Sequence, residues 1–182
     1  VKELYNVDIL EEDKDGGIHP QRVKKLFIQK KADRTLAEAL KYHYQRGEIG
    51  TIREILNQII KKTQEELWEY GVYDMTFSFP VNWGVDYLEN GIDVRLFDFW
   101  EITTDEEEAL QNLQRKIGQG FQSGFNWEIM AETHPLSIIN LTDKDIAEWF
   151  LDRIKQEFSL EKFEEYWERN CLLYTSPSPR DL

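Results

Sequence analysis

The sequence predicts an α+β fold, in which helices pack on one face of a small antiparallel three-stranded meander and a helical pair follows at the C-terminal end. Two observations carry this prediction. Between Pro20 and Gly71 apolar residues repeat with the helical period of about 3.6 residues, and after Gly71 they repeat with the two-residue period of a strand. Asn90 and Gly91 then give the strongest turn signal in the chain, because both tolerate the positive φ of a type I′ hairpin turn.

The first elements come from local patterns near the N-terminus. Residues 3–12 alternate weakly and predict a strand, and the run 13–17 has the composition of a turn. Pro20 suits the first position of a helix that would run to about Lys31. A second helix is predicted over residues 34–45.

A third helix has the clearest pattern. Thr51 and Glu54 have the spacing of a capping box, in which each side chain bonds to the other residue's backbone N–H. Gly71 is expected to end the helix. Its apolar stripe consists of Ile52, Ile55, Leu56, Ile59, Ile60 and Leu67.

The predicted sheet follows this helix. Residues 73–81 alternate between apolar and polar side chains and predict the first strand. With the Asn-Gly pair as the hairpin loop, residues 85–89 face residues 92–96, and Asp86 lies opposite Arg95 as a cross-strand ion pair. The three segments together would form a meander.

Helices account for most of the remaining chain. Acidic residues in a first turn predict a helix over residues 105–117, and a glycine-containing loop follows at 118–124. Two further helices are predicted at 143–158 and from Ser159 through Trp167, and these form the C-terminal pair.

The last twelve residues, CLLYTSPSPRDL at 171–182, differ in character from the rest of the chain. They resemble, letter for letter through Asp181, one reading frame of a transposon-end sequencing adapter. We therefore expect residues 171–182 to be disordered and the natural chain to be interrupted at about Asn170. The expected organisation is a strand and turn over 1–19 and a single α+β domain over 20–170.

Composition excludes several classes of function. Cys171 is the only cysteine, so thiol catalysis and cysteine metal sites are not expected in the remaining chain. This fits a reducing cytoplasm, and no apolar run approaches the length of a membrane span. The net charge of −13 is uneven, because residues 19–46 carry +6 whereas residues 1–18, 47–100 and 101–170 are acidic.

The basic segment supports one alternative function. Three helices followed by a hairpin resemble, in element order, a winged helix-turn-helix domain over residues 20–102. This resemblance implies nucleic-acid binding, with phosphates contacted by Arg22, Lys24, Lys25, Lys30, Lys31, Arg34 and Lys41.

Acidic residues suggest two metal sites, and neither pattern is complete. The run from Glu11 to Gly16 imitates the start of a calcium loop, but Arg22 stands where the loop needs a bidentate acid. Asp93, Asp98 and Glu101 lie along one predicted strand, which suggests a magnesium-dependent nuclease as a second alternative. The strand lacks the lysine that accompanies such carboxylates, so we assign no metal, cofactor or catalytic residue.

The leading interpretation is a non-enzymatic cytoplasmic binding or regulatory protein of bacterial or phage origin, which acts through a protein partner. It is based on the absence of catalytic spacing and on an acidic, aromatic-rich composition. The aromatic residues expected at the binding surface are Trp83, Tyr87 and Trp100.

Overall fold

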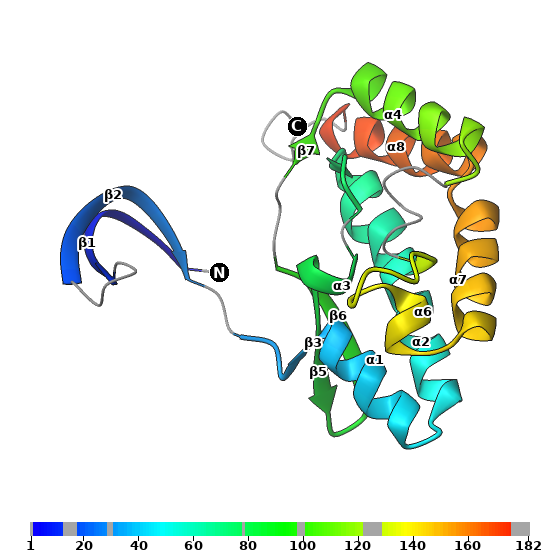
Figure 1. The fold of residues 1–182 in the computed structure, drawn as a ribbon. Helices are drawn as coiled ribbons and strands as arrows, with labels where there is room; N and C mark the ends of the chain where they lie inside the picture. Colours follow the sequence, from blue (N-terminus) through cyan, green and yellow to red (C-terminus); the bar gives the residue numbers. More distant parts are fainter. Residues whose placement is uncertain are drawn as a thin grey trace. The chain divides into compact units, whose positions relative to one another are not determined.

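A computed structural model describes the chain over residues 2–12, 18–28, 31–77, 79–97, 101–121 and 129–175. The chain divides into two compact units, Val1–Lys31 and Ala32–Leu182 (Figure 1). Among the described residues, no helix is both long enough and apolar enough to cross a bilayer.

The first unit is a two-stranded antiparallel ribbon. Strand β1 (Lys2–Glu12) pairs with β2 (Ile18–Ile28), so the strand predicted at 3–12 is confirmed. The helix predicted from Pro20 was wrong, because this segment is β2. Pro20 lies opposite Leu10, and a proline that cannot donate a ladder hydrogen bond is tolerated because each strand of a two-stranded ribbon is an edge. The turn predicted at 13–17 lies outside the described residues.

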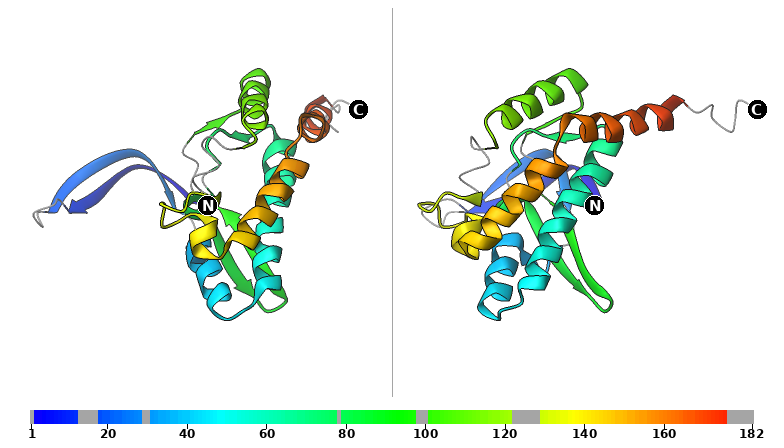
Figure 2. Two further views of the ribbon diagram at one scale, coloured as in Figure 1. Left: turned by 45° about the vertical axis from the view of Figure 1, so that its right-hand side comes forward. Right: turned by 90° about the vertical axis from the view of Figure 1, so that its right-hand side faces the viewer.

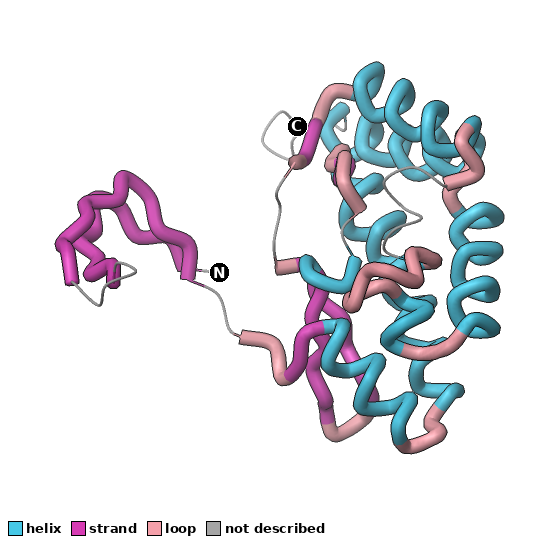
Figure 3. Tube along the Cα trace, viewed as in Figure 1, coloured by secondary structure: helices cyan, strands magenta, loops and turns pink. Residues whose placement is uncertain are grey.

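The second unit confirms the α+β class. Its main sheet has the strand order β3-β5-β6 and is antiparallel, with β3 at Arg34–Thr35, β5 at Trp83–Leu88 and β6 at Gly91–Leu96 (Figure 3). Helices α1 (Leu36–Gln45) and α2 (Ile49–Lys62) pack against this sheet. The third strand is therefore not the predicted 73–81 segment, and the sheet is not a meander.

The β5–β6 hairpin has a different register from the predicted one. Tyr87 lies opposite Ile92 instead of Val94, and the two-residue loop consists of Glu89 and Asn90. Neither loop residue has a positive φ, and Gly91, the first residue of β6, has a φ of +140°, whereas a type I′ turn centred on Asn90-Gly91 would need a positive φ at both of those positions. The turn therefore begins one residue earlier than predicted.

The predicted strand at 73–81 is mostly not a strand. Among the described residues of this segment, only β4 (Tyr73–Asp74) is a strand, and it pairs with β7 (Ile102–Thr103). The Asp74 carboxylate then accepts hydrogen bonds from the Thr76 backbone and hydroxyl and from the Phe77 backbone, at 2.8–3.0 Å. These bonds turn the chain, and Phe77 has a φ of +54°. Tyr73 and Phe77 are buried, although the strand that would explain their alternation is absent.

The capping box occurs at α1 and not at the predicted position. Thr35 Oγ1 accepts from the backbone N–H of Glu38 at 3.2 Å, and Glu38 accepts from that of Thr35 at 2.9 Å. Helix α2 begins at Ile49, so Thr51 lies inside it and its spacing to Glu54 does not mark a helix start.

Helix α2 continues into a π-helical turn, η1 (Thr63–Leu67), and a 3₁₀ turn, η2 (Trp68–Tyr70). It ends at Gly71, whose φ of +69° suits a C-terminal cap, as predicted. The predicted apolar stripe is confirmed, because each of its six members is buried.

Three of the remaining helices match the helices predicted at 105–117, at 143–158 and from Ser159, whereas the short helices at Phe79–Asn82 and Ile138–Leu141 were not predicted. Asp105 and Asp143 each accept an N-terminal backbone N–H, and Ser159 does the same for the last helix. The helices are α3 (Phe79–Asn82), α4 (Glu106–Gly118), α6 (Ile138–Leu141), α7 (Lys144–Glu157) and α8 (Leu160–Thr175). Figure 2 shows α7 beside α2, and α8 packs against η1 and η2, which continue α2.

Aromatic side chains join the C-terminal pair to the rest of the unit. The Trp68 ring lies 4.9 Å from that of Phe158 and 5.3 Å from that of Phe163, which in turn stacks on Trp167 at 4.8 Å. All four side chains are buried, so this cluster fixes α8 against η2.

Helix α8 extends beyond the predicted end. The backbone is helical through Thr175, so the expectation of irregular chain from Cys171 was wrong for residues 171–175. The rest of the adapter-like segment, 176–182, lies outside the described residues.

Candidate binding surface

Of the three aromatic residues predicted at a binding surface, the structure describes Trp83 and Tyr87, and only Tyr87 is exposed. Trp83 is buried, because β5 has no exposed side over its first four residues, and its assignment to the surface was wrong. Trp100 lies outside the described residues. Tyr87 is 37% exposed near the end of β5, next to the more exposed Leu88.

The seven basic residues do not form the predicted helical face. Arg22, Lys24 and Lys25 belong to strand β2 of the first unit, and Lys30 lies outside the described residues. Lys31 ends the first unit. Only Arg34 and Lys41 belong to the second unit, where Arg34 lies in β3 and the exposed Lys41 lies on α1.

A chain of hydrogen bonds connects α1 to β5 at Tyr87. His43 lies on α1 and is buried, with Nδ1 2.6 Å from Oε2 of Glu48 and Nε2 2.9 Å from the Tyr87 hydroxyl. A carboxylate only accepts, so Nδ1 carries the proton that is donated to Glu48. In the neutral ring, Nε2 then accepts from the Tyr87 hydroxyl. This chain fixes the position of a half-exposed tyrosine.

The electrostatics of this chain favour a protonated tyrosine and an ionised glutamate. Burial raises the pKa of Tyr87, and the nearby Arg34 guanidinium opposes part of that effect. Hydrogen bonds from Arg46 and then His43 lower the pKa of Glu48. Tyr87 is therefore a neutral hydrogen-bonding group and not an activated nucleophile.

Two arginines lie close to the Tyr42 ring. The Cζ atom of Arg34 is 4.2 Å from the ring centroid and that of Arg46 is 5.2 Å from it. Arg46 Nε also donates to Oε1 of Glu48 at 2.9 Å. The Tyr42 ring meets His43 edge to face at 5.1 Å, which joins the arginines to the hydrogen-bond chain.

We call the resulting set the Tyr42–Tyr87 surface. It combines two arginines, two tyrosines, a buried histidine and one glutamate, contributed by β3, α1, the turn between α1 and α2, and β5. Its members are Arg34, Tyr42, His43, Arg46, Glu48 and Tyr87.

Sequence reasoning missed most of this surface. Tyr42 and Arg46 have the i, i+4 spacing that places two helical side chains together, and that signal was present. The contact between His43 and Tyr87 spans 44 residues and depends on how α1 packs on β5. No local pattern encodes it.

The structure describes two of the three carboxylates proposed for a nuclease, Asp93 and Glu101. Asp93 forms an ion pair with Lys62 of α2 at 2.8 Å, and Glu101 is exposed. Asp98 lies outside the described residues. In the described part of the chain, no group of three or more His, Cys, Asp or Glu residues could hold a metal ion.

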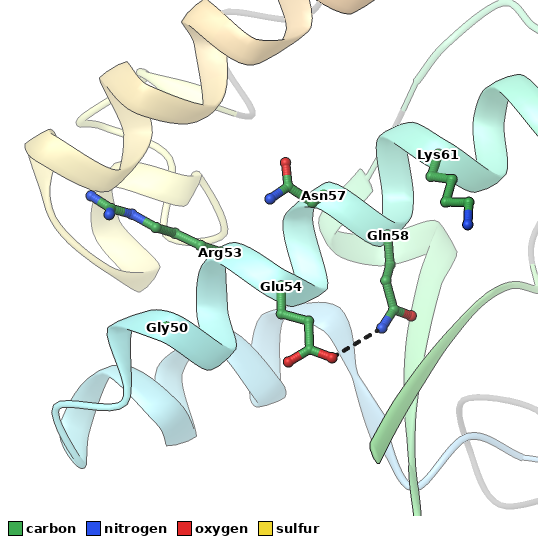
Figure 4. A pocket seen from close by; sticks show the side chains of 6 residues that line it. All are labelled: Gly50, Arg53, Glu54, Asn57, Gln58 and Lys61. Atoms are coloured by element: carbon green, nitrogen blue, oxygen red, sulfur yellow. Dashed lines mark hydrogen bonds between the residues drawn. The ribbon is translucent and has the colours of Figure 1, made fainter. Parts of the chain in front are cut away.

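A hollow lies along one face of α2 (Figure 4). Its polar side chains bond to neighbouring elements: Gln58 donates to the Ile92 carbonyl at 2.8 Å, and Arg53 lies 5.3 Å from the Trp149 ring. These contacts make it a weaker candidate than the Tyr42–Tyr87 surface. It is lined by Gly50, Arg53, Glu54, Asn57, Gln58 and Lys61.

Comparison of the chain with protein-family models, with curated protein sequences and with solved structures found no match in any of the three.

Proposed function

We propose that this protein is a non-enzymatic intracellular binding protein that acts through a protein partner docked on the Tyr42–Tyr87 surface. The observation that carries the proposal is the fixed position of Tyr87, which His43 holds at 2.9 Å while the ring stays 37% exposed. A tyrosine that is already ordered loses little side-chain entropy when it is covered by a partner.

The composition of the surface supports a protein partner. Tyrosine and arginine are the residue types that contribute most often to binding energy at protein interfaces. Tyr42, Tyr87, Arg34 and Arg46 supply two of each, and Leu88, 58% exposed, adds an apolar side chain beside Tyr87.

Local charge favours a protein over a nucleic acid as the partner. Three carboxylates lie at or beside this surface. Glu48 pairs with Arg46, the Asp86 carboxylate accepts from the Asp33 backbone N–H, and the Asp33 carboxylate accepts from the Tyr87 backbone N–H. The whole chain carries −13, which opposes the approach of a long polyanion. The basic stretch predicted for nucleic-acid binding is divided between the two units.

Site-specific photo-crosslinking tests this proposal. A photoreactive amino acid placed at Leu88 should give discrete crosslinked proteins in a bacterial lysate. These products should disappear when Tyr42→Ala or Tyr87→Ala is added. Tyr70, 60% exposed and on η2, provides the matched control position. Identical products from both positions, or products that a nuclease removes and a protease does not, would contradict the proposal.

A further inference from the structure

Arg34 differs from the other arginine of the Tyr42–Tyr87 surface in its pairing. Arg46 Nε is 2.9 Å from Oε1 of Glu48, whereas Arg34 has no carboxylate partner among the residues that the structure describes. Arg34 is half-buried and lies 4.2 Å from the centroid of the Tyr42 ring. A guanidinium that is partly removed from water and lacks a carboxylate partner gains more from a carboxylate than a fully hydrated cation does.

The surface has no carboxylate of its own left for Arg34. Glu48 is the acidic member, and its two oxygens are taken by His43 Nδ1 and Arg46 Nε. Asp86, on the neighbouring β5, pairs with Arg95 at 2.6 Å and accepts from the Asp33 backbone at 3.2 Å. None of these described carboxylates pairs with Arg34, so its guanidinium can receive a carboxylate from another molecule.

We propose that the partner presents an acidic peptide segment, in which an Asp or Glu carboxylate pairs with the Arg34 guanidinium beside the Tyr42 ring. This inference rests on the proposed function and specifies the chemistry of the partner. The planar fork of an arginine suits a carboxylate in a two-bond arrangement. A peptide with one or two acids meets less repulsion from the acidic chain than a polyanion with regularly repeated phosphates.

A random twelve-residue peptide library displayed on phage and selected on the intact protein tests this inference. Selected peptides should be enriched in Asp and Glu. Synthetic versions should bind at least about tenfold more weakly when their acids are replaced by Asn or Gln, as expected for one charge-assisted pair. The variant Arg34→Gln should show the same loss, and Arg34→Lys should retain part of the affinity.

Arg53→Gln is the matched control, because Arg53 also lies over an aromatic ring, that of Trp149 at 5.3 Å. It should leave peptide affinity unchanged, and circular dichroism should confirm that each variant is folded. The inference is overturned if no peptide is selected, if acids are not enriched, or if Arg34→Gln binds as well as the unaltered protein. A single-stranded oligonucleotide that binds more tightly than the best peptide would also overturn it.

The two proposals fail separately. If the Leu88 crosslinks persist in Arg34→Gln but vanish in Tyr42→Ala, the result supports a protein partner and overturns the acidic segment at Arg34. If acidic peptides bind through Arg34 while no protein crosslinks at Leu88, the proposed function fails and the carboxylate site remains.

Discussion

Arg95 reaches diagonally across the hairpin from β6 to Asp86 on β5, with Nη2 2.6 Å from Oδ2. The Asp86 side chain is 7% exposed, and its other oxygen accepts from the Asp33 backbone at 3.2 Å. Asp33 in turn accepts from the backbone N–H of Tyr87 at 2.8 Å. These contacts hold the end of β5, and therefore Tyr87, against the segment that precedes β3.

Removing the Asp86 carboxylate should destabilise the fold. Asp86→Ala leaves the Arg95 guanidinium, one-third exposed, without its partner, and we expect a loss of about 2–3 kcal/mol in the free energy of unfolding. Urea denaturation measures this loss. The exposed pair between Lys144 and Glu148 is the control, and Glu148→Ala should cost about 0.5 kcal/mol or less. Equal losses in the two variants would contradict the structural role given to Asp86.

Two glycines should respond in opposite directions to replacement by alanine. A Cβ at Gly84 would lie 2.4 Å from Cβ of Ala32 and 2.8 Å from the Phe97 ring, so Gly84→Ala should destabilise the protein by about 1–3 kcal/mol. Gly50 lies inside α2 with nothing within 4 Å of an added Cβ. Gly50→Ala should therefore stabilise the protein by about 0.5 kcal/mol. Thermal melting of both variants tests the packing of β5, and a Gly84→Ala protein as stable as the unaltered one would contradict it.

The hairpin shows why a sequence can give the right contact with the wrong register. The predicted and observed registers differ by two residues, and a shift of two keeps each side chain on the same face of the sheet. Asp86 and Arg95 thus become diagonal neighbours instead of direct partners, and a long arginine still spans that distance. The apolar pattern specifies the face, whereas the turn specifies the register.

The segment after Gly71 shows a second limit of pattern reading. Alternating apolar residues report which side chains are buried, and both Tyr73 and Phe77 are indeed buried. They do not predict the backbone conformation, because Asp74 turns the chain by accepting three local hydrogen bonds. The Tyr42–Tyr87 surface lay beyond sequence reasoning for a related reason: His43 meets Tyr87 only because α1 packs on β5.

Removing one hydroxyl should test the connection between α1 and β5. Tyr87→Phe keeps the ring but leaves Nε2 of the buried His43 without its partner, which should cost about 1–2 kcal/mol in the free energy of unfolding. Tyr70→Phe, at a tyrosine that is 60% exposed, should cost far less. Chemical denaturation of both variants gives the comparison. A Tyr87→Phe protein of unchanged stability would show that the hydrogen bond does not hold the tyrosine in place.

Acid should weaken the Tyr42–Tyr87 surface through Glu48. Hydrogen bonds from Arg46 and then from His43 lower the pKa of Glu48 in the folded protein below its unfolded value of about 4.3. A lowered folded pKa adds stability above the unfolded pKa, and that contribution is lost as the pH falls through the folded value. The stability advantage of the unaltered protein over Glu48→Gln should therefore shrink in acid.

Arg46→Gln removes the larger cause of the lowered Glu48 pKa, so that variant should show a smaller acid-dependent loss of stability. Urea denaturation at a series of pH values measures both effects. The contrary outcome is that the free energies of unfolding of the unaltered protein and Glu48→Gln differ by the same amount throughout the acid range. Such a constant difference would mean that Glu48 does not bind His43 and Arg46 as a charged group.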